Sequence, residues 1–283
     1  MLIEVVRPGP LATVQDLGRP GRAHLGVPRS GAADERALRL ANRLVGNPEG
    51  AAGVELTFGG AALRFHGHAW VAVTGAPVTV RVDGRAHGTN APCFVADGAV
   101  VEVGTPSSGL RSYLAVRGGV VVDEVLGSRS TDLLSGLGPA PLAQGDRLPI
   151  GSCKGLTGIA VDVAPVPPLP ETPVLQVRPG PRNDWFADDA LATLTSALYE
   201  VSADSNRVGV RLDGPPLARA REGELGSEGM VTGAVQVPPS GLPIIFLADH
   251  PTTGGYPVIA VIGSAAVADA AQLRPGQKLR FRL

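Results

Sequence analysis

Lysine, cysteine and long apolar runs are all scarce in this 283-residue chain. Only Lys154 and Lys278 are lysines among its 25 basic residues, and 26 acidic residues leave a net charge of −1. A nucleic-acid-binding protein usually carries a concentrated basic excess. We therefore expect no nucleic-acid partner.

The two cysteines, Cys93 and Cys153, lie far apart and form no CxxC pair, which excludes a disulfide scaffold and a thiolate zinc site. His66 and His68 have no further His, Asp or Glu cluster beside them, so no metal site is expected. The N-terminus lacks a signal pattern, and every apolar run is far shorter than the roughly 18 residues of a membrane span. We expect a cytoplasmic protein that contacts no membrane.

Several motifs of self-contained enzymes are also missing. The sequence has no GxxxxGK[ST] phosphate loop, so we do not expect this chain to bind ATP alone. It has no GxGxxG opening a helix, no HExxH and no GxSxG. Neither lysine lies in a segment typical of biotin attachment.

Glycine and proline, by contrast, are abundant. The 38 glycines and 26 prolines make up about 23% of the chain, while hydrophobic residues at 44% are plentiful enough to form cores. This composition favours many short strands joined by tight turns. A proline-rich stretch at 164–173 reads as a linker, which predicts two lobes, at residues 1–167 and 168–283.

Short alternating apolar segments predict strands in both lobes, including Val120–Val122 in the first. Helices are predicted at Ala33–Val45, with Ser30 as a candidate N-cap, at Asp188–Tyr199 and at Ala265–Gln272. The expected fold is mainly β: two barrel-like lobes with a few short helices.

Polar residues gather in two glycine- and proline-rich loops of the first lobe, around the predicted helix start. They are Asp16, Arg19, Ser30 and Asp34. Backbone N–H groups there could receive an anionic group. Ordinary helix capping and a tight turn explain the same residues equally well.

A denser polar group occupies about 50 residues of the second lobe. Gln236 interrupts an apolar strand pattern, which costs free energy unless a partner satisfies its amide. Asp249 follows the apolar run Ile244–Ala248, a favourable place for a functional carboxylate, and residues 252–256 could surround an oxyanion with backbone donors. Each of these features, taken alone, is also compatible with ordinary turns.

Seven ordered motifs carry a resemblance to a known family. They are QDLGRPG, GVPRSGAAD, LAVRGG, LGSRSTD, SNRVGVRLDG, SEGMVTGAVQVPPSGLPIIFLAD and TTGGYP. Together they resemble the allophanate hydrolase subunit 2 family, which is also the C-terminal part of the carboxyltransferase domain of urea carboxylase. The resemblance implies cyclophilin-like β-barrel lobes and a partner of the subunit-1 (B-type) family.

Many stand-alone members of this family are regarded as the C subunit of 5-oxoprolinase, which acts with A and B subunits. The resemblance therefore implies a hydrolase complex that uses ATP to open a small cyclic amide. For catalysis we predict Asp249, Glu228 and Arg207. For substrate binding we predict Asn206, Gln236, Thr253, Gly254, Gly255, Tyr256, Asp16, Arg19 and Ser30.

Two other functions remain open at this point. One is the carboxyltransferase component of a biotin-dependent urea carboxylase, with biotin supplied by separate modules. The other is a non-catalytic antagonist of a kinase-inhibitor protein, which needs no small-molecule site.

Overall fold

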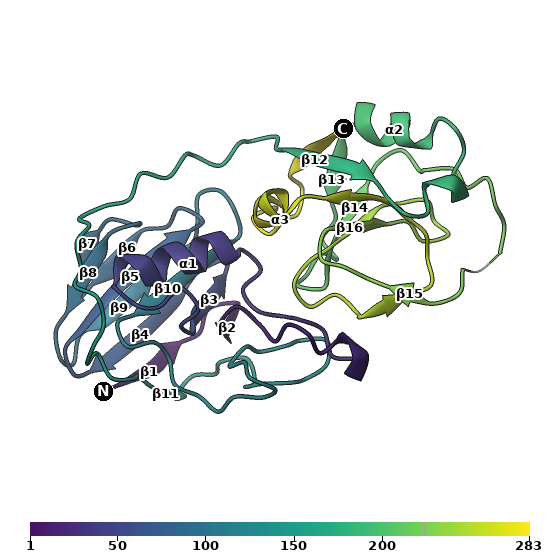
Figure 1. The fold of residues 1–283 in the computed structure, drawn as a ribbon. Helices are drawn as coiled ribbons and strands as arrows, with labels where there is room; N and C mark the ends of the chain where they lie inside the picture. Colours follow the sequence, from purple (N-terminus) through teal and green to yellow (C-terminus); the bar gives the residue numbers. More distant parts are fainter. Residues whose placement is uncertain (224) are drawn as a thin grey trace. The chain divides into compact units, whose positions relative to one another are not determined.

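The computed structural model of the protein describes residues 1–223 and 225–283 (Figure 1). The chain divides into two compact units, each built from separate stretches of sequence. Unit 1 comprises Met1–Arg19, Ser30–Asp132 and Gly136–Pro168, and unit 2 comprises Pro20–Arg29, Leu133–Ser135 and Leu169–Leu283. Two short segments that precede the proline-rich stretch thus belong to unit 2.

Unit 1 consists of two antiparallel sheets around one apolar core. One sheet has the order β11-β1-β4-β9-β6-β7 and the other the order β2-β3-β10-β5-β8. The strands are β1 (Leu2–Arg7), β2 (Leu11–Gln15), β3 (Gly53–Thr57), β4 (Ala61–His66), β5 (Ala69–Gly75), β6 (Val80–Val82), β7 (Arg85–His87), β8 (Pro92–Val95), β9 (Val100–Val103), β10 (Arg111–Val116) and β11 (Arg147–Pro149). Side chains from both sheets, such as Phe65 and Leu114, share the core.

Helix α1 (Glu35–Leu44) covers the outer face of the second sheet (Figure 1). Its apolar side packs against Ala72 of β5 and Ala115 of β10. Every residue of β10 is buried, because the core covers one face of this strand and α1 the other. The helix is two residues shorter at its start than the predicted Ala33–Val45.

The cap of α1 corrects one prediction. The carboxylate of Asp34, not the hydroxyl of Ser30, accepts a hydrogen bond from the Ala37 backbone N–H, at 3.0 Å. Ser30 has a left-handed backbone (φ 54°) and donates to the carbonyl of Thr131 at 3.1 Å. Its side chain therefore ties the chain to a distant loop.

Unit 2 is a closed barrel with the strand order β12-β19-β16-β17-β14-β13-β20. These strands are β12 (Val174–Pro179), β13 (Tyr199–Val201), β14 (Gly209–Asp213), β16 (Ala234–Gln236), β17 (Ile244–Phe246), β19 (Val258–Ile262) and β20 (Lys278–Arg282). A separate ribbon pairs β15 (Glu228–Gly229) with β18 (Thr253–Gly254). The parallel pairing of β12 with β20 closes the barrel.

The remaining helical elements are short. They are η1 (Ala23–Leu25), η2 (Asn183–Trp185), α2 (Ala190–Ser196) and α3 (Ser264–Ala270). The predicted helix Asp188–Tyr199 is too long at both ends, because Tyr199 begins β13 and is fully buried in the barrel core. The predicted strand Val120–Val122 is also wrong, since Val120 forms only an isolated bridge to Ile150.

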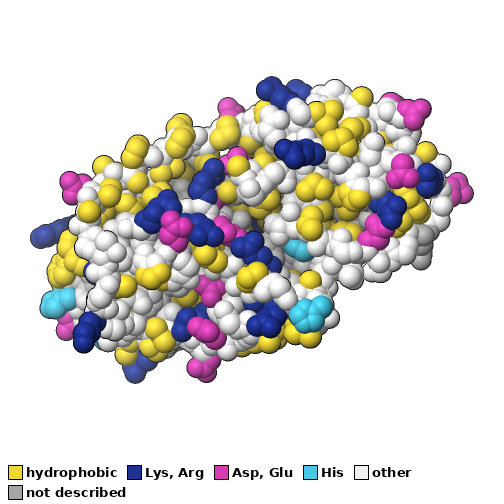
Figure 2. Space-filling model, viewed as in Figure 1, with side chains coloured by type: hydrophobic (Ala, Val, Ile, Leu, Met, Phe, Trp, Pro, Cys, Tyr) yellow, Lys and Arg dark blue, Asp and Glu magenta, His cyan; other side chains and the backbone are white. Residues whose placement is uncertain are grey.

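The mainly β fold, with its barrel and a few short helices, is confirmed. None of the helices in the described part of the chain has the length and apolar character to cross a membrane. On the face drawn in Figure 2, Lys and Arg side chains are mixed with Asp and Glu side chains.

A buried hydrogen-bond chain fixes the start of α1 on the sheet below it. The Tyr113 hydroxyl accepts from the Asp34 backbone N–H at 2.7 Å and donates to Glu55 Oε2 at 2.8 Å. Burial and the neighbouring carboxylates raise the pKa of Tyr113 well above its usual value. The hydroxyl therefore keeps its proton at neutral pH, and its hydrogen bond to Glu55 is maintained there.

Tyr113→Phe should lower the free energy of unfolding by about 1–3 kcal/mol, because the buried Asp34 N–H and the buried Glu55 carboxylate each lose a hydrogen bond to the hydroxyl. Urea unfolding followed by circular dichroism measures the loss. Tyr199→Phe is the matched control, since its hydroxyl makes a single 3.2 Å bond to the Pro215 carbonyl. Equal losses in the two variants would contradict this account of Tyr113.

Candidate functional site

The predicted residues Asp16, Arg19 and Ser30 meet around residues 128–132 of unit 1. Asp16 directly follows β2, and its Oδ1 accepts from the hydroxyls of Ser128 at 2.6 Å and Ser130 at 2.5 Å. The Gly18 N–H (2.8 Å) also reaches Oδ1, and the Arg129 N–H (2.7 Å) reaches Oδ2. With four donors around it, the carboxylate of Asp16 fastens this loop to the end of β2.

Arg19 is 1% exposed and therefore needs internal partners. Its Nη2 donates to the Ser130 carbonyl at 2.5 Å, and its Nε donates to the Val125 carbonyl at 3.3 Å. Nη1 lies 3.9 Å from Asp132 Oδ2, which makes an ion pair but is too long for a hydrogen bond. The structure thus brings a buried positive charge to the loop that Asp16 holds.

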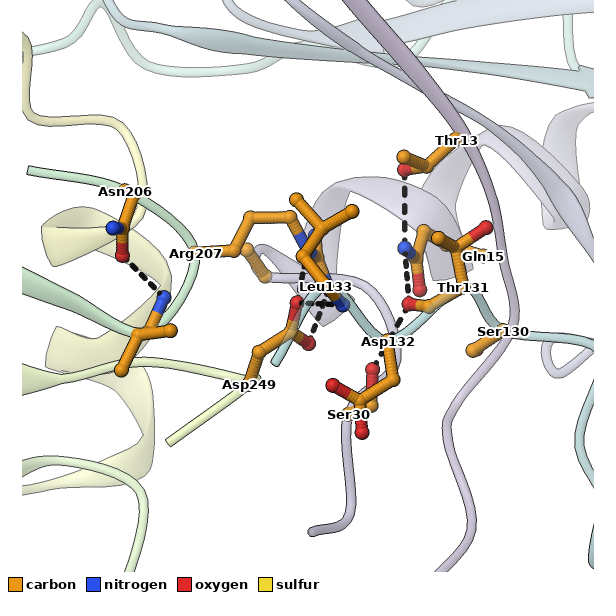
Figure 3. A network of polar contacts seen from close by, with 12 residues as sticks. Thr13, Gln15, Ser30, Ser130, Thr131, Asp132, Leu133, Asn206, Arg207 and Asp249 are labelled. Carbon is orange, nitrogen blue, oxygen red and sulfur yellow. Dashed lines mark hydrogen bonds and ion pairs between the residues drawn. The ribbon is translucent and has the colours of Figure 1, made fainter. Parts of the chain in front are cut away.

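In unit 2, the barrel brings Arg207 and Asp249 together (Figure 3). Gly209 at the start of β14 is level with Phe246 at the end of β17, so the residues just outside these two strands face each other. Arg207 Nε donates to Asp249 Oδ2 at 2.9 Å, and Nη2 donates to Oδ1 at 3.0 Å. Both side chains are almost completely buried, so this is a two-pronged ion pair out of water.

Asp249 also holds a distant segment of unit 2. Its Oδ2 accepts from the Leu133 backbone N–H at 3.1 Å, which docks the segment Leu133–Ser135 (Figure 3). Asn206, next to Arg207, is exposed, and its Oδ1 accepts from the Val208 N–H at 2.8 Å. That bond shapes the turn that leads into β14.

A second group lies on the ribbon of β15 and β18, where Glu228 is level with Gly254. Arg182 forms a two-pronged ion pair with Glu228, with its Nε 3.0 Å from Oε2 and its Nη2 on Oε1. The bond from Arg182 lowers the pKa of Glu228. Glu228 is therefore a partly exposed carboxylate that stays ionised at neutral pH.

Gln236, Gly254 and Tyr256 lie beside this ribbon. Gln236 is 5% exposed, and its Nε2 donates to the Tyr256 carbonyl at 3.1 Å, which satisfies the polar interruption of β16. A Cβ on Gly254 would lie 2.7 Å from Gln236 Nε2, so a larger residue there would displace the Gln236 amide. The Tyr256 ring is 43% exposed and lies under Arg219, whose Cζ is 5.9 Å from the ring centre.

These two groups of unit 2 lie at opposite ends of one strand. Gln236 is level with Ile244 at the start of β17, whereas Asp249 follows the end of that strand. Thr253 and Gly254 form β18, and Gly255 directly follows them. They lie close to Gln236, whose Nε2 also reaches Met230 Sδ at 3.8 Å. The polar residues that are close in sequence thus form two separate groups.

Sequence reasoning missed several polar residues that these groups depend on. Arg182 lies in a loop without a recognisable motif. This loop is tightly packed, because a Cβ on the nearby Gly180 would lie 2.4 Å from the Val258 carbonyl oxygen. Gln15 and Thr131 lie in two of the seven family motifs, but neither is among the predicted site residues. The signal used for Gln236 was a polar residue within an apolar strand pattern. Applied to the strand before Asp16, the same signal would have identified Gln15.

No group of three or more His, Cys, Asp or Glu side chains that could hold a metal ion occurs among residues 1–223 and 225–283. His66 pairs with Glu4, at 2.9 Å between Nε2 and Oε2. The Asp97 N–H donates to His68 Nδ1 at 3.2 Å, and the His68 ring stacks on Phe94. Both histidines thus have protein partners.

The sequence model of the family described as "Carboxyltransferase domain, subdomain A and B" matches residues 25–283. The chain belongs to this family. The predicted resemblance to the carboxyltransferase domain is therefore confirmed.

Relatives within the family have different names. The chain is 39% identical to the C subunit of 5-oxoprolinase from Escherichia coli over 99% of its own length and 90% of that protein. It is 34% identical to urea amidolyase of Lachancea kluyveri over 98% of its length, but spans only 17% of that protein. Among solved structures, that of TTHA0988 superposes with a TM-score of 0.91 at 36% identity, covering all of this chain and about half (55%) of that one.

The buried pair in unit 2 makes a clear stability prediction. Asp249→Asn should lower the free energy of unfolding by about 3–5 kcal/mol, because it removes the charge of one partner from the buried, two-pronged ion pair with Arg207. Glu49→Gln is the control: Glu49 pairs with Arg39 and Arg43 on the surface, where such pairs contribute about 0–1 kcal/mol. Chemical denaturation measures both, and a loss below about 1 kcal/mol in Asp249→Asn would show that the pair does not stabilise unit 2.

Proposed function

We propose that this chain is the C subunit of an ATP-dependent 5-oxoprolinase. In that complex it acts with a subunit-1/B-type partner and an A-type subunit to open 5-oxoproline, a small cyclic amide, to glutamate. The observation that carries the proposal is the similarity to the C subunit of the Escherichia coli 5-oxoprolinase, which extends over 90% of that protein. The function of a relative that is matched over nearly its whole length is a better guide than that of a relative matched over a small part. The 5-oxoprolinase subunit is covered to 90% and urea amidolyase to 17%.

The chemistry sets what the complex must supply. A lactam is a poor electrophile. Transfer of the γ-phosphoryl group of ATP to the lactam oxygen releases ADP and activates the carbonyl carbon of the ring. Water adds to that carbon and loses a proton to a base, the ring C–N bond breaks, and the nitrogen takes up a proton. The resulting glutamyl phosphate reacts with a second water to give glutamate and phosphate. The ATP chemistry belongs to the assembled complex in this proposal.

Glu228 is our choice for the base among the predicted catalytic residues. A base must be ionised and must reach the water it deprotonates. The side chain of Glu228 is 29% exposed, and the ion pair with Arg182 keeps its carboxylate ionised. The neighbouring residues Thr253–Tyr256 would offer backbone donors to the developing oxyanion.

Asp249 and Arg207 have a different role in this proposal. The two oxygens of Asp249 already accept from Arg207 and from the Leu133 N–H, and the carboxylate is fully buried. We therefore assign them, with Asn206 in the adjoining turn, as positioning residues that hold one edge of the barrel. Asp16, saturated by four donors, is likewise a positioning residue in unit 1.

A second candidate is a carboxyltransferase component of a biotin-dependent urea carboxylase. The observation in its favour is the 34% identity to urea amidolyase over 98% of this chain. In that case the same polar groups would receive carboxybiotin and an amide substrate, and biotin would be carried by another module.

The proposal predicts 5-oxoproline-dependent ATP hydrolysis with formation of glutamate by the chain assembled with its genomic neighbours. Omitting this chain should abolish coupled turnover. Avidin is the control, because it blocks biotin-dependent carboxylation and should leave lactam opening unchanged. Turnover of urea that avidin inhibits, without turnover of 5-oxoproline, would favour the second candidate.

Glu228→Gln should lower kcat of the assembled complex by about 10²–10⁴-fold, the usual loss when a general base is removed. Glu200→Gln, at an exposed position of β13, is the matched control and should keep kcat within twofold. Steady-state kinetics and a comparison of complex assembly by gel filtration distinguish catalysis from folding. A kcat for Glu228→Gln equal to that of the control would remove Glu228 from the mechanism.

The pH profile gives an independent check on the same residue. Arg182 lowers the pKa of Glu228, so the acidic fall in kcat/KM should lie below the ordinary glutamate pKa. Arg182→Ala should move that fall to higher pH, because the carboxyl then binds its proton more readily. A profile that does not move would mean that another group controls the acidic limb.

A further inference from the structure

The guanidinium of Arg219 in unit 2 has no carboxylate partner in the described part of the chain. Arg219 follows β14 in a loop and is half-buried. Its Nη2 donates to the Val237 carbonyl at 2.8 Å, and no other side-chain hydrogen bond joins it to a described residue. Its Nε is closed to solvent and is unpaired among residues 1–223 and 225–283. A partly buried cation costs free energy unless a counter-charge offsets it, so this guanidinium is suited to an anion from outside the chain.

Two neighbouring arginines show what Arg219 lacks. Arg182 forms the two-pronged ion pair with Glu228, and Arg221 pairs with Asp184 at 2.9 Å on the surface. Each of these two cations is therefore balanced by a carboxylate of the protein. A ligand carboxylate would give Arg219 the kind of partner that the other two arginines find within the chain.

Arg219 is connected to the candidate site through Tyr256. The Cζ of Arg219 is 5.9 Å from the centre of the Tyr256 ring, which is 43% exposed. Tyr256 comes two residues after Gly254, so the Cα atoms of Tyr256 and Gly254 are at most about 7 Å apart. Gly254 is in turn level with Glu228 on the ribbon of β15 and β18. The chain between the residue under the cation and the residue opposite the candidate base thus spans no more than a small molecule does.

The free edge of the Arg219 guanidinium matches a carboxylate. A guanidinium has five N–H donors, and the bond to the Val237 carbonyl uses one of them. Nη1 bonds to no described residue, and it is not among the unpaired atoms that are closed to solvent. Nη1 and Nη2 form a planar edge that can hold both oxygens of a carboxylate. The exposed Tyr256 ring offers an apolar surface for a small ring attached to that carboxylate.

We infer that Arg219, held over the Tyr256 ring, binds the carboxylate of a small cyclic amide acid and is a specificity residue of the site. Under the proposed function, on which this inference rests, the acid is 5-oxoproline. A carboxylate on Arg219 would hold the ring of the substrate against Tyr256 and leave its amide within reach of the ribbon that carries Glu228. Cyclic amides without a carboxylate would bind poorly.

Arg219→Gln tests this role, because it removes the charge and keeps a polar side chain. In the assembled complex the KM for 5-oxoproline should rise about 10–100-fold with little change in kcat, since the carboxylate is bound equally before and during the reaction. Arg219→Lys keeps the charge and should recover part of that loss. Arg221→Gln is the matched control, because it removes an exposed arginine two residues away, and its KM should stay within twofold.

An unchanged KM in Arg219→Gln would overturn the inference and leave the proposed function intact. A fall in kcat without a rise in KM would also overturn it, because Arg219 would then affect the reaction or the fold and not the binding of a carboxylate.

Calorimetric binding to the full chain needs no turnover and separates this subsite from the proposed function. The probes are 5-oxoproline and 2-pyrrolidone, the lactam that lacks the carboxylate. Wild type should bind the acid at least about tenfold more tightly, and Arg219→Gln should bind the two compounds about equally. That pattern, without turnover of 5-oxoproline by the complex, would retain the subsite and reject the proposed function. No preference for the acid in wild type, or the same preference in Arg219→Gln, would reject the subsite.

Discussion

A charged group buried in a protein is tolerated only when other groups neutralise it and satisfy its hydrogen bonds. This constraint organises the polar loops of both units. Asp249 satisfies Arg207 at the barrel edge and in doing so fixes a backbone N–H more than a hundred residues away in sequence. Asp16 gathers two serine hydroxyls and two backbone N–H groups around one carboxylate. The loops that carry the family motifs are therefore shaped largely by the needs of a few buried charges.

The same constraint separates structural from chemical roles among the polar residues. Asp249 and Asp16 have all their bonding capacity directed at the protein itself. Glu228 differs, because its Arg182 partner leaves it partly exposed. Gln15 and Thr131 differ in another way, since Gln15 Oε1 and Thr131 Oγ1 have no hydrogen-bond partner among the described residues. Reactivity and ligand binding are expected where a polar group is held in place but not saturated.

The sequence was sufficient to predict the fold class and the general places of the helices. Alternating apolar residues report burial directly, so the strands of both units follow from them, although only unit 2 forms a closed barrel. The end of α2 could not be predicted in this way. Tyr199 continues the helical pattern in the sequence, but in the structure it is a buried residue of strand β13. Ser30 illustrates a similar limit: a capping residue was expected, but a distant carbonyl, that of Thr131, competes for its hydroxyl.

The candidate site shows where sequence proximity misleads. Gln236 and Asp249 are close in the chain, yet the register of β16 and β17 places them at opposite ends of a strand. Arg182 is distant from Glu228 in the chain and still forms its ion pair. Strand register depends on the packing of the whole barrel, so it cannot be predicted from a local sequence pattern. The residue types at the site were predictable, whereas their partners were not.

Fold and reaction are only loosely linked in this family. Relatives named as the C subunit of 5-oxoprolinase and as urea amidolyase both match nearly the whole chain. The same architecture therefore occurs in proteins that carry different names. Differences among members are expected in the few unsaturated polar residues.

The make-up of unit 2 affects how the protein is made. Its barrel strands all come from residues after 168, but Pro20–Arg29 and Leu133–Ser135 are synthesised much earlier. During translation these two segments leave the ribosome long before the barrel that they join exists. Unit 1 can form its sheets at that stage, while the early segments remain without their final environment until the last strand, β20, has emerged. Cutting the gene at the proline-rich stretch would therefore give a C-terminal product that lacks two pieces of its own unit, and the two products would have to find each other before unit 2 is complete.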